Sequence, residues 1–177
     1  MFFCGTPFFF MWNQGFGDLL RIGYQNRPLL FDLNIKLPDV LYEQVFEVSE
    51  RLDSKGRIIH QLDENTARIA LRKAKSDGIN CVAIAFMNSY LNPVHEDKIA
   101  QIAIEEKFSQ ISVSHKVSPL IKLVGRGDTT VVDAYLSPIL RRYVEQVSSA
   151  LEDSKSTKLM FMQSNGGLTD ANLFQGK

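Results

Sequence analysis

The chain has 177 residues, of which 45% are hydrophobic and 23% are charged, as in an ordinary globular domain. Twenty basic and twenty acidic side chains give a formal net charge of zero, so the basic excess of a nucleic-acid binder is absent. Two cysteines, Cys4 and Cys81, are too few for a disulfide framework, and Cys81 lies in an apolar run typical of a buried thiol. These features favour a cytoplasmic protein.

The first twelve residues, Met1–Trp12, are rich in aromatic side chains. They are too few to span a bilayer, which takes about 20 apolar residues, and they lack the positive start and cleavage site of a secretory signal. One interpretation is a short anchor to a membrane or a partner. We favour an accidental N-terminus, such as a misassigned or frame-shifted start, and expect this segment to contribute little to the core.

Three local structures are expected between residues 15 and 61. Residues 15–23 predict a turn, a short helix and a glycine stop, and residues 24–38 predict an ordered loop with two prolines. Residues 43–51 predict a strand. The turn residues 53–56 then lead into residues 57–61, which we expect to return as a hairpin partner of that strand.

A strand–helix–strand pattern follows. Asp63 is a suitable N-cap for a helix to about Ser76, which Gly78 ends. Residues 79–87 are almost continuously apolar, which indicates a strand covered on both faces.

Next along the chain, Asn92 and Pro93 predict the start of a helix over residues 94–108. Residues 111–115 alternate in polarity and predict the next strand. With the strand at 79–87 they form a βαβ unit, in which we expect the two strands to be parallel and the crossover right-handed.

The last third predicts a long helix from Asp128 to about Leu151, which Pro138 should kink or divide. Residues 158–163 predict a buried strand that ends in a glycine turn at residues 164–167. A final helix capped by Thr169 or Asp170 is then expected.

The three histidines, His60, His95 and His115, raise the question of a metal site. No two of them have the spacing of zinc ligands on a helix. We therefore favour surface or structural histidines and predict no metal site.

Two segments are candidates for substrate or phosphate binding. The first is a glycine-flexed loop at Arg126, with Asp128 and Thr129 at the start of the long helix, where free N–H groups and the arginine fork suit an anionic or carboxylate group. The alternative is an ordinary helix cap with a surface arginine.

The second candidate is the turn at Asn165, Gly166 and Gly167, which follows a predicted strand, where α/β sheets gather ligands. An ordinary Asn-Gly turn is the alternative. Because a strand that follows a helix returns to the level where that helix began, we expect Arg126 and Asn165 to line one cleft.

Several runs resemble the hydantoinase A and 5-oxoprolinase family. The most specific is Gly125-Arg-Gly-Asp-Thr-Thr-Val-Val-Asp-Ala-Tyr-Leu-Ser-Pro-Ile-Leu-Arg-Arg-Tyr143, followed by Phe161-Met-Gln-Ser-Asn-Gly-Gly-Leu168. The segments Gly15–Pro28 and Asn92–Glu96 are also similar. The resemblance covers residues 15–177. It divides the chain into a non-family segment at 1–14, the remainder of the family's N-terminal domain at 15–120, and the start of its central domain at 121–177.

The resemblance implies an α/β fold with a mixed or parallel sheet and flanking helices, part of an actin-like, ribonuclease-H-like ATPase scaffold. It also implies ATP-dependent opening of 5-oxo-L-proline to L-glutamate, a reaction of glutathione metabolism, with ATP and magnesium as cofactors in the complete enzyme. Its partners would be the small cyclic amide substrate and a hydantoinase B-type domain or subunit, with neither nucleic acid nor membrane.

The chain departs from that family pattern at the nucleotide motifs. Neither the Asp-x-Gly-Gly-Thr phosphate motif nor the Ser-Gly-Pro-Ala-Gly-Gly segment is present. We therefore expect an internal fragment of a 5-oxoprolinase that needs no cofactor and is inactive alone. The alternatives are a fragment of a hydantoinase A or acetone carboxylase-like subunit, and a non-catalytic interaction module.

Overall fold

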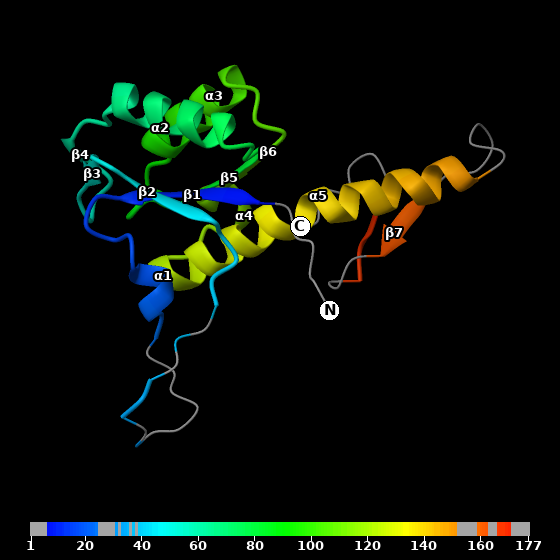
Figure 1. Ribbon diagram of the computed structural model, residues 1–177, viewed down its shortest axis with the longest axis horizontal. Helices are drawn as coiled ribbons and strands as arrows, with labels where there is room; N and C mark the ends of the chain where they lie inside the picture. Colours follow the sequence, from blue (N-terminus) through cyan, green and yellow to red (C-terminus); the bar gives the residue numbers. More distant parts are fainter. Residues whose placement is uncertain are drawn as a thin grey trace.

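A four-stranded parallel sheet forms the centre of the computed structural model (Figure 1). The structure describes residues 7–24, 31, 33–35, 37, 39–151, 159–162 and 166–170. The sheet contains β1 (Phe8–Asn13), β2 (Gln44–Val48), β5 (Cys81–Ile84) and β6 (Gln110–Val113), in the spatial order β2-β1-β5-β6. All three strand pairs are parallel, which confirms the expected fold class.

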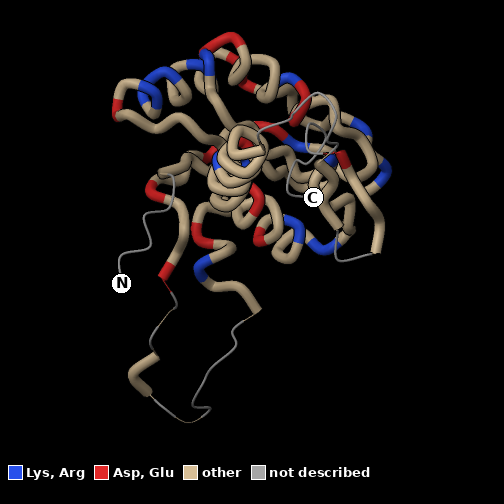
Figure 2. Tube along the Cα trace, turned by 90° about the vertical axis from the view of Figure 1, so that its right-hand side faces the viewer, with Lys and Arg blue, Asp and Glu red and all other residues tan. Residues whose placement is uncertain are grey.

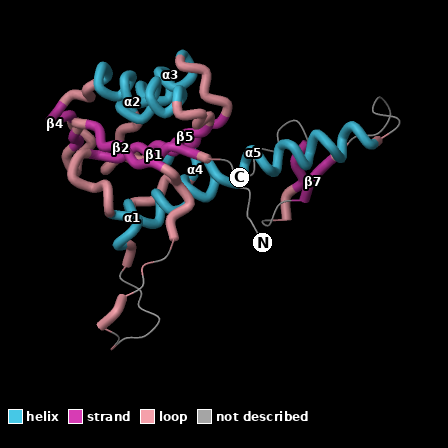
Figure 3. The backbone as a smooth tube through the Cα atoms, viewed as in Figure 1, coloured by secondary structure: helices cyan, strands magenta, loops and turns pink. Residues whose placement is uncertain are grey.

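Helices cover both faces of this sheet (Figure 3). On one face lie α2 (Glu64–Ser76) and α3 (Val94–Glu105), and on the other lie the short α1 (Leu19–Ile22) and the long α5 (Leu123–Ala150). A one-turn helix, α4 (Ser114–Val117), follows β6 directly. Two hydrophobic clusters fill the space between the sheet and its two helical layers.

The central strand β1 is formed by the segment whose sequence suggested an accidental N-terminus. All six of its residues are buried, and they alternate between the two cores: Phe9 and Met11 face α2 and α3, whereas Phe8, Phe10 and Trp12 face α5. The prediction that Met1–Trp12 contributes little to the core is therefore wrong. A continuous apolar run is what a strand buried on both faces requires.

The predicted βαβ unit is confirmed. Strands β5 and β6 pair in parallel, with Cys81 opposite Gln110, and α3 connects them. Cys81 is buried, and burial raises the pKa of its thiol. The last strand ends two residues earlier than expected, because Ser114 and His115 already belong to α4.

The start of α2 is also as predicted. The Asp63 carboxylate accepts hydrogen bonds from the Thr66 backbone N–H at 3.0 Å and from the Thr66 hydroxyl at 2.6 Å. Gly78, with φ of +87°, follows the end of the helix in a conformation that favours glycine.

The strand expected at residues 43–51 is divided in two. Its first part is β2, which pairs in parallel with β1 rather than with the returning hairpin strand. Its second part is β3 (Arg51–Leu52), which pairs antiparallel with β4 (Ile58–His60). Ser49 and Glu50, between the two parts, leave the sheet at its edge.

Helix α5 begins at Leu123, five residues before the predicted start at Asp128. The expected loop at residues 126–128 is therefore wrong, because these residues lie in the first turns of the helix. A Cβ at Gly127 would lie 2.7 Å from Cη2 of Trp12, so this glycine permits close approach of α5 to β1. Pro138 lies within the helix and does not divide it.

The C-terminal region forms a two-stranded antiparallel hairpin of β7 (Met160–Met162) and β8 (Leu168–Asp170). Met160 and Met162 are exposed, so the prediction of a buried strand here is wrong. Thr169 and Asp170 pair in β8, and the helix expected after them lies outside the described residues. Asn165 lies outside the described residues.

Charged residues of both signs are interspersed along the helices and loops in view in Figure 2. None of the helices in the described ranges is long and apolar enough to cross a bilayer.

Candidate functional site at the carboxyl edge of the sheet

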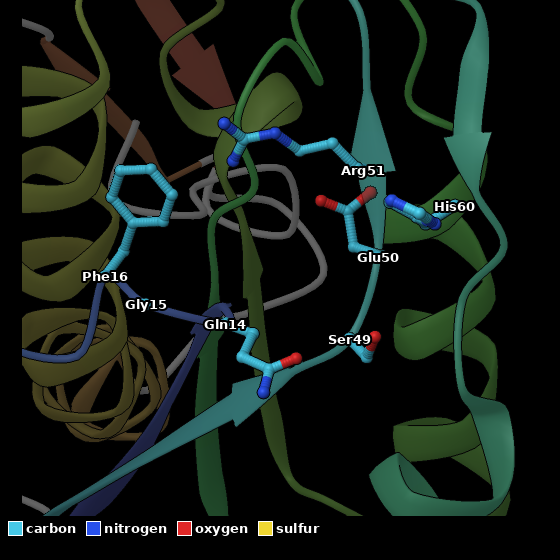
Figure 4. Close-up of a pocket in the computed structure, with 7 residues that line it drawn as sticks. All are labelled: Gln14, Gly15, Phe16, Ser49, Glu50, Arg51 and His60. Carbon is cyan, nitrogen blue, oxygen red and sulfur yellow. The ribbon is translucent and has the colours of Figure 1, made fainter.

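A pocket of about 510 Å³ lies where β1 and β2 end (Figure 4). Residues Gln14, Gly15 and Phe16 follow β1 and form one side, and Ser49 and Glu50 follow β2 and form the other, together with Arg51 and His60 of the hairpin. The strand order turns back at β1, which has β2 on one side and β5 on the other. Ligands of open α/β sheets bind outside the carboxyl ends of strands at such a point.

The wall of this pocket contains a buried acid–imidazole pair. Oε2 of Glu50 lies 2.5 Å from Nδ1 of His95, and both side chains are almost inaccessible to solvent. Oε1 of Glu50 and Nε2 of His95 have no hydrogen-bond partner. Burial raises the pKa of the Glu50 carboxyl, and the hydrogen bond from His95 opposes that shift.

Arg51 and His60 face each other across the β3–β4 hairpin, where their Cα atoms are register partners. The Arg51 side chain extends across the pocket to Phe16, and its Cζ lies 5.4 Å from the centre of that ring (Figure 4). A guanidinium over an aromatic face is held in place while its N–H edge stays available to an anion.

Next to the pocket, Glu96 connects three segments at the carboxyl edge of the sheet through hydrogen bonds. Its buried carboxylate accepts hydrogen bonds from the Phe86 backbone N–H at 2.8 Å and the Ser114 hydroxyl at 2.6 Å. The other oxygen lies 3.1 Å from the His115 backbone nitrogen and 2.6 Å from its Nδ1. Glu96 thus fixes the turns that follow β5 and β6 relative to the start of α3.

Arg126 completes this buried network from α5. Its Nε donates to the Ser114 hydroxyl at 2.9 Å, Nη1 to the Leu120 carbonyl at 2.7 Å and Nη2 to the Phe86 carbonyl at 2.5 Å. Burial lowers the pKa of the guanidinium, and the negative charge of Glu96 opposes that shift. A carboxylate and a guanidinium joined through one hydroxyl balance each other's charge in a buried place.

The first predicted binding segment, Arg126 with Asp128 and Thr129, lies inside α5 and not in a loop before it. Arg126 is fully buried, and all three of its nitrogens donate to the protein, so it is not a surface arginine at a loop. Asp128 and Thr129 lie on the exposed side of α5, where the Thr129 hydroxyl donates to the Gly125 carbonyl at 2.8 Å. An anion-binding role for these three residues stays a prediction.

The second predicted segment is described only in part. Gly166 and Gly167 lie in the turn of the β7–β8 hairpin, which is distant from the first turn of α5 (Figure 1). Because Asn165 is outside the described residues, the cleft expected between Arg126 and Asn165 stays a prediction.

The histidines have structural partners in two cases, and the third lines the pocket. His95 contacts Glu50 and His115 contacts Glu96, whereas His60 is exposed at the end of β4. Within the described ranges no group of three or more His, Cys, Asp or Glu side chains could hold a metal ion.

Sequence reasoning missed the pocket residues Gln14, Glu50 and Arg51 as a site. The missed signal is Asn13-Gln14-Gly15, a polar turn directly after an apolar run, which marks a strand end once that run is recognised as β1. For His60 the sequence raised a metal-ligand or acid–base role, and did not indicate that it lines a pocket.

The fold is that of an α/β domain with a parallel sheet covered on both faces, and a pocket with polar lining lies at the carboxyl edge of this sheet. The hydantoinase/oxoprolinase N-terminal region matches residues 5–107, and the hydantoinase/oxoprolinase domain matches residues 126–177. The chain belongs to the hydantoinase/oxoprolinase family. The first match begins inside the segment 1–14, which was expected to lie outside the family, and a domain boundary at 120/121 stays a prediction.

Among its relatives is the 5-oxoprolinase of Saccharomyces cerevisiae, which is 37% identical over 94% of this chain and 15% of its own length. The ATP-dependent caprolactamase of Pseudomonas jessenii is structurally similar with a TM-score of 0.81 and 28% identity, over 94% of this chain and 25% of its own. Nucleotide-free acetone carboxylase has a TM-score of 0.79 at 23% identity, over 97% of this chain and 26% of its own, and shares the fold alone. The chain thus spans about one seventh of the length of the curated relative that it matches.

Proposed function

We propose that this chain acts as part of an ATP-dependent 5-oxoprolinase, which opens 5-oxo-L-proline to L-glutamate. The observation that carries the proposal is the 37% identity to yeast 5-oxoprolinase over 94% of the chain. The carboxyl edge supports it, because polar side chains from β1, β2 and the β3–β4 hairpin converge there on one pocket. ATP and magnesium would be bound by parts of such an enzyme other than the described residues.

In this function the described residues bind and position. Glu96 and Arg126 hold the turns after β5 and β6 in place, so that the edge presents a rigid surface to a substrate. Rigid placement lowers the entropy cost of aligning a lactam with a phosphate donor. Opening a lactam is difficult because the amide is unreactive, and this explains the need for ATP.

A caprolactamase-like or acetone carboxylase-like role is the second candidate. The caprolactamase neighbour supports it, since that enzyme is ATP-dependent by its own description and is 28% identical to this chain over the aligned residues. Both candidates place this chain in an ATP-dependent enzyme, and they differ in the substrate.

A partner of the hydantoinase B type is part of the same proposal. Large apolar side chains are exposed on α5 and the β7–β8 hairpin, namely Leu136, Tyr143, Met160, Met162 and Leu168. Exposed apolar surface of this kind favours contact with another domain or subunit. The alternative is a non-catalytic interaction module that docks on such a partner subunit.

The test is a segment exchange in yeast 5-oxoprolinase, in which this chain replaces the segment that it matches. The exchanged enzyme should form glutamate from 5-oxo-L-proline when ATP is present. A matched exchange that carries Trp12→Ala controls for the folding of the segment, because Trp12 is fully buried in the core.

The same exchanged enzyme is also offered caprolactam. Turnover of caprolactam without turnover of 5-oxo-L-proline would favour the second candidate. An exchanged enzyme that folds like the parent, by circular dichroism and thermal midpoint, yet turns over neither substrate would contradict both candidates.

A further inference from the structure

The pocket at the carboxyl edge contains a cation whose charge is not neutralised by an ion pair. None of the ion pairs among the described residues includes Arg51, although its neighbour Arg57 pairs with Asp53 at 2.7 Å. Arg51 instead lies over the Phe16 ring, with its guanidinium above the pocket (Figure 4). An arginine held in this way is suited to a carboxylate, which it can bind through two parallel N–H bonds.

The acidic group beside Arg51 forms no ion pair with it. Glu50 is among the residues that line the pocket, but its side chain is buried, its Oε2 is occupied by His95, and its Oε1 has no hydrogen-bond partner. Burial raises the pKa of this carboxyl, and the contact with His95 and the charge of Arg51 oppose that shift. A buried polar atom without a partner is costly, and a ligand group that approaches it recovers part of that cost.

The remaining lining side chains are polar. The Gln14 side chain extends toward Ser49, and His60 lies beside Glu50 (Figure 4). The volume of about 510 Å³ is within the range of small-molecule sites, roughly 300–1,000 Å³. The pocket therefore combines the Arg51 guanidinium with several hydrogen-bonding side chains and the aromatic ring of Phe16.

We propose that this pocket binds a small organic carboxylate that carries an amide, with its carboxylate on Arg51 and its amide toward Gln14, Ser49 and Glu50. A lactam acid such as 5-oxo-L-proline belongs to this class, and in that form the inference rests on the proposed function. Phe16 packs against the apolar part of the ligand ring. Arg51 is then the residue that selects an acid over a neutral lactam.

The test is a titration of the isotope-labelled 177-residue chain, followed by NMR amide shifts. The probes are 5-oxo-L-proline, the neutral lactam 2-pyrrolidinone and acetate, each up to about 10 mM. We expect shifts at residues 14–16 and 49–51 with 5-oxo-L-proline, and binding at least about tenfold weaker for both other probes, since each lacks one of the two groups. Equal binding of acetate would overturn the role of the amide, and equal binding of 2-pyrrolidinone would overturn that of the carboxylate.

Arg51→Gln should weaken 5-oxo-L-proline binding at least about tenfold, as expected for a lost bidentate contact. Arg57→Gln is the matched control, because it removes the same charge from the same hairpin at a residue that does not line the pocket. If Arg51→Gln binds as tightly as the parent chain, or if no shift occurs at any concentration, the pocket is not the site.

Different experimental outcomes would contradict the proposed function and the proposed carboxylate pocket. An exchanged yeast enzyme with Arg51→Gln that keeps its KM for 5-oxo-L-proline would contradict the pocket and leave the proposed function intact. Specific binding of 5-oxo-L-proline by this chain, together with a folded but inactive exchanged enzyme, would retain the pocket and contradict the function.

Discussion

At the residue scale, glycines in the first turns of α5 decide how closely this helix approaches the sheet. A Cβ at Gly127 would meet Trp12 at 2.7 Å and Leu20 at 3.1 Å, whereas one at Gly125 would meet only the Tyr24 hydroxyl, at 3.5 Å. The first position has no room for a methyl group unless buried Trp12 shifts. The second has ordinary van der Waals space.

Gly127→Ala and Gly125→Ala should consequently change stability in opposite directions. Gly125→Ala gains helix propensity of up to about 1 kcal/mol. Gly127→Ala gains the same propensity but overpacks the core, which costs about 1–3 kcal/mol. Urea denaturation of both variants measures the difference, and a stabilised Gly127→Ala would show that α5 adjusts freely over Trp12.

Glu50 provides a second residue-scale prediction, concerning pH. Because burial raises its pKa in the folded state, the folded chain binds more protons than the unfolded chain above pH of about 4.5. The contribution of Glu50 to stability is therefore greatest at low pH and is lost as pH rises. Glu50→Gln removes this titration and keeps a hydrogen-bonding group beside His95.

The free energy of unfolding of Glu50→Gln, relative to the parent chain, should increase as pH rises from about 4.5 to 8. Urea denaturation at several pH values measures it. Glu64→Gln is the control, since Glu64 is a half-exposed glutamate that pairs with Lys98 at the surface. A difference between Glu50→Gln and parent that stays constant over this range would contradict the prediction.

At the element scale, β1 holds the two cores together, since its side chains enter both. Trp12 is fully buried, lies 4.7 Å from Phe10 between ring centres and contacts α5 at Gly127. Trp12→Ala should cost about 3–5 kcal/mol, which is a large part of the stability of a domain of this size.

Chemical denaturation of Trp12→Ala checks this cost. Ile69→Ala on α2 is the control, because Ile69 is 68% exposed and its loss should change stability by less than about 0.5 kcal/mol. If Trp12→Ala does not fold, the same denaturation is measured on the milder substitution Trp12→Phe. A loss below about 1 kcal/mol for Trp12→Ala would mean that β1 is peripheral after all.

The elements that could be predicted from sequence are those with local signals. Helix α2 has a cap at Asp63 and a glycine after its end, and β5 is an apolar run between two helices. The start of α5 could not be predicted from the sequence. Two nearby glycines, Gly125 and Gly127, suggest a loop as long as the packing of Gly127 against Trp12 is not known. Tertiary contact, not propensity, determines that start.

The candidate site was harder to predict than the fold. Its residues come from three separate segments, and only the pairing of β1 with β2 brings Gln14 beside Glu50. Arg126 was singled out from the sequence as a binding residue, and that role stays a prediction. Its three hydrogen bonds go to Leu120, Ser114 and Phe86, which lie 6, 12 and 40 residues away in the chain. Spacing along a chain carries little information about such convergence.

At the scale of the whole molecule, the chain matches about one seventh of the length of a related enzyme, and the nucleotide motifs of that family are not found in its sequence. No metal-binding cluster is present within the described ranges, and the sequence has no Asp-x-Gly-Gly-Thr motif. Phosphoryl transfer requires a metal ion and groups that hold phosphates.

The isolated chain should therefore hydrolyse ATP in the presence of 5-oxo-L-proline at well below about 1 s⁻¹, the low end of ordinary enzyme turnover. A coupled assay for phosphate measures this, with yeast 5-oxoprolinase as the positive control. Turnover at or above that value, which survives repurification, would contradict the prediction.

The position of β1 in the sheet has a consequence for how the chain folds during synthesis. Its partner β5 pairs Cys81 with Phe8, 73 residues later in the chain (81 − 8). At about 5–20 residues per second, a ribosome takes roughly 4–15 s to add that length. Throughout this interval the most apolar strand of the protein has no second neighbour, so chaperone binding to the nascent chain should concentrate on Phe8–Trp12 and end once β5 has emerged.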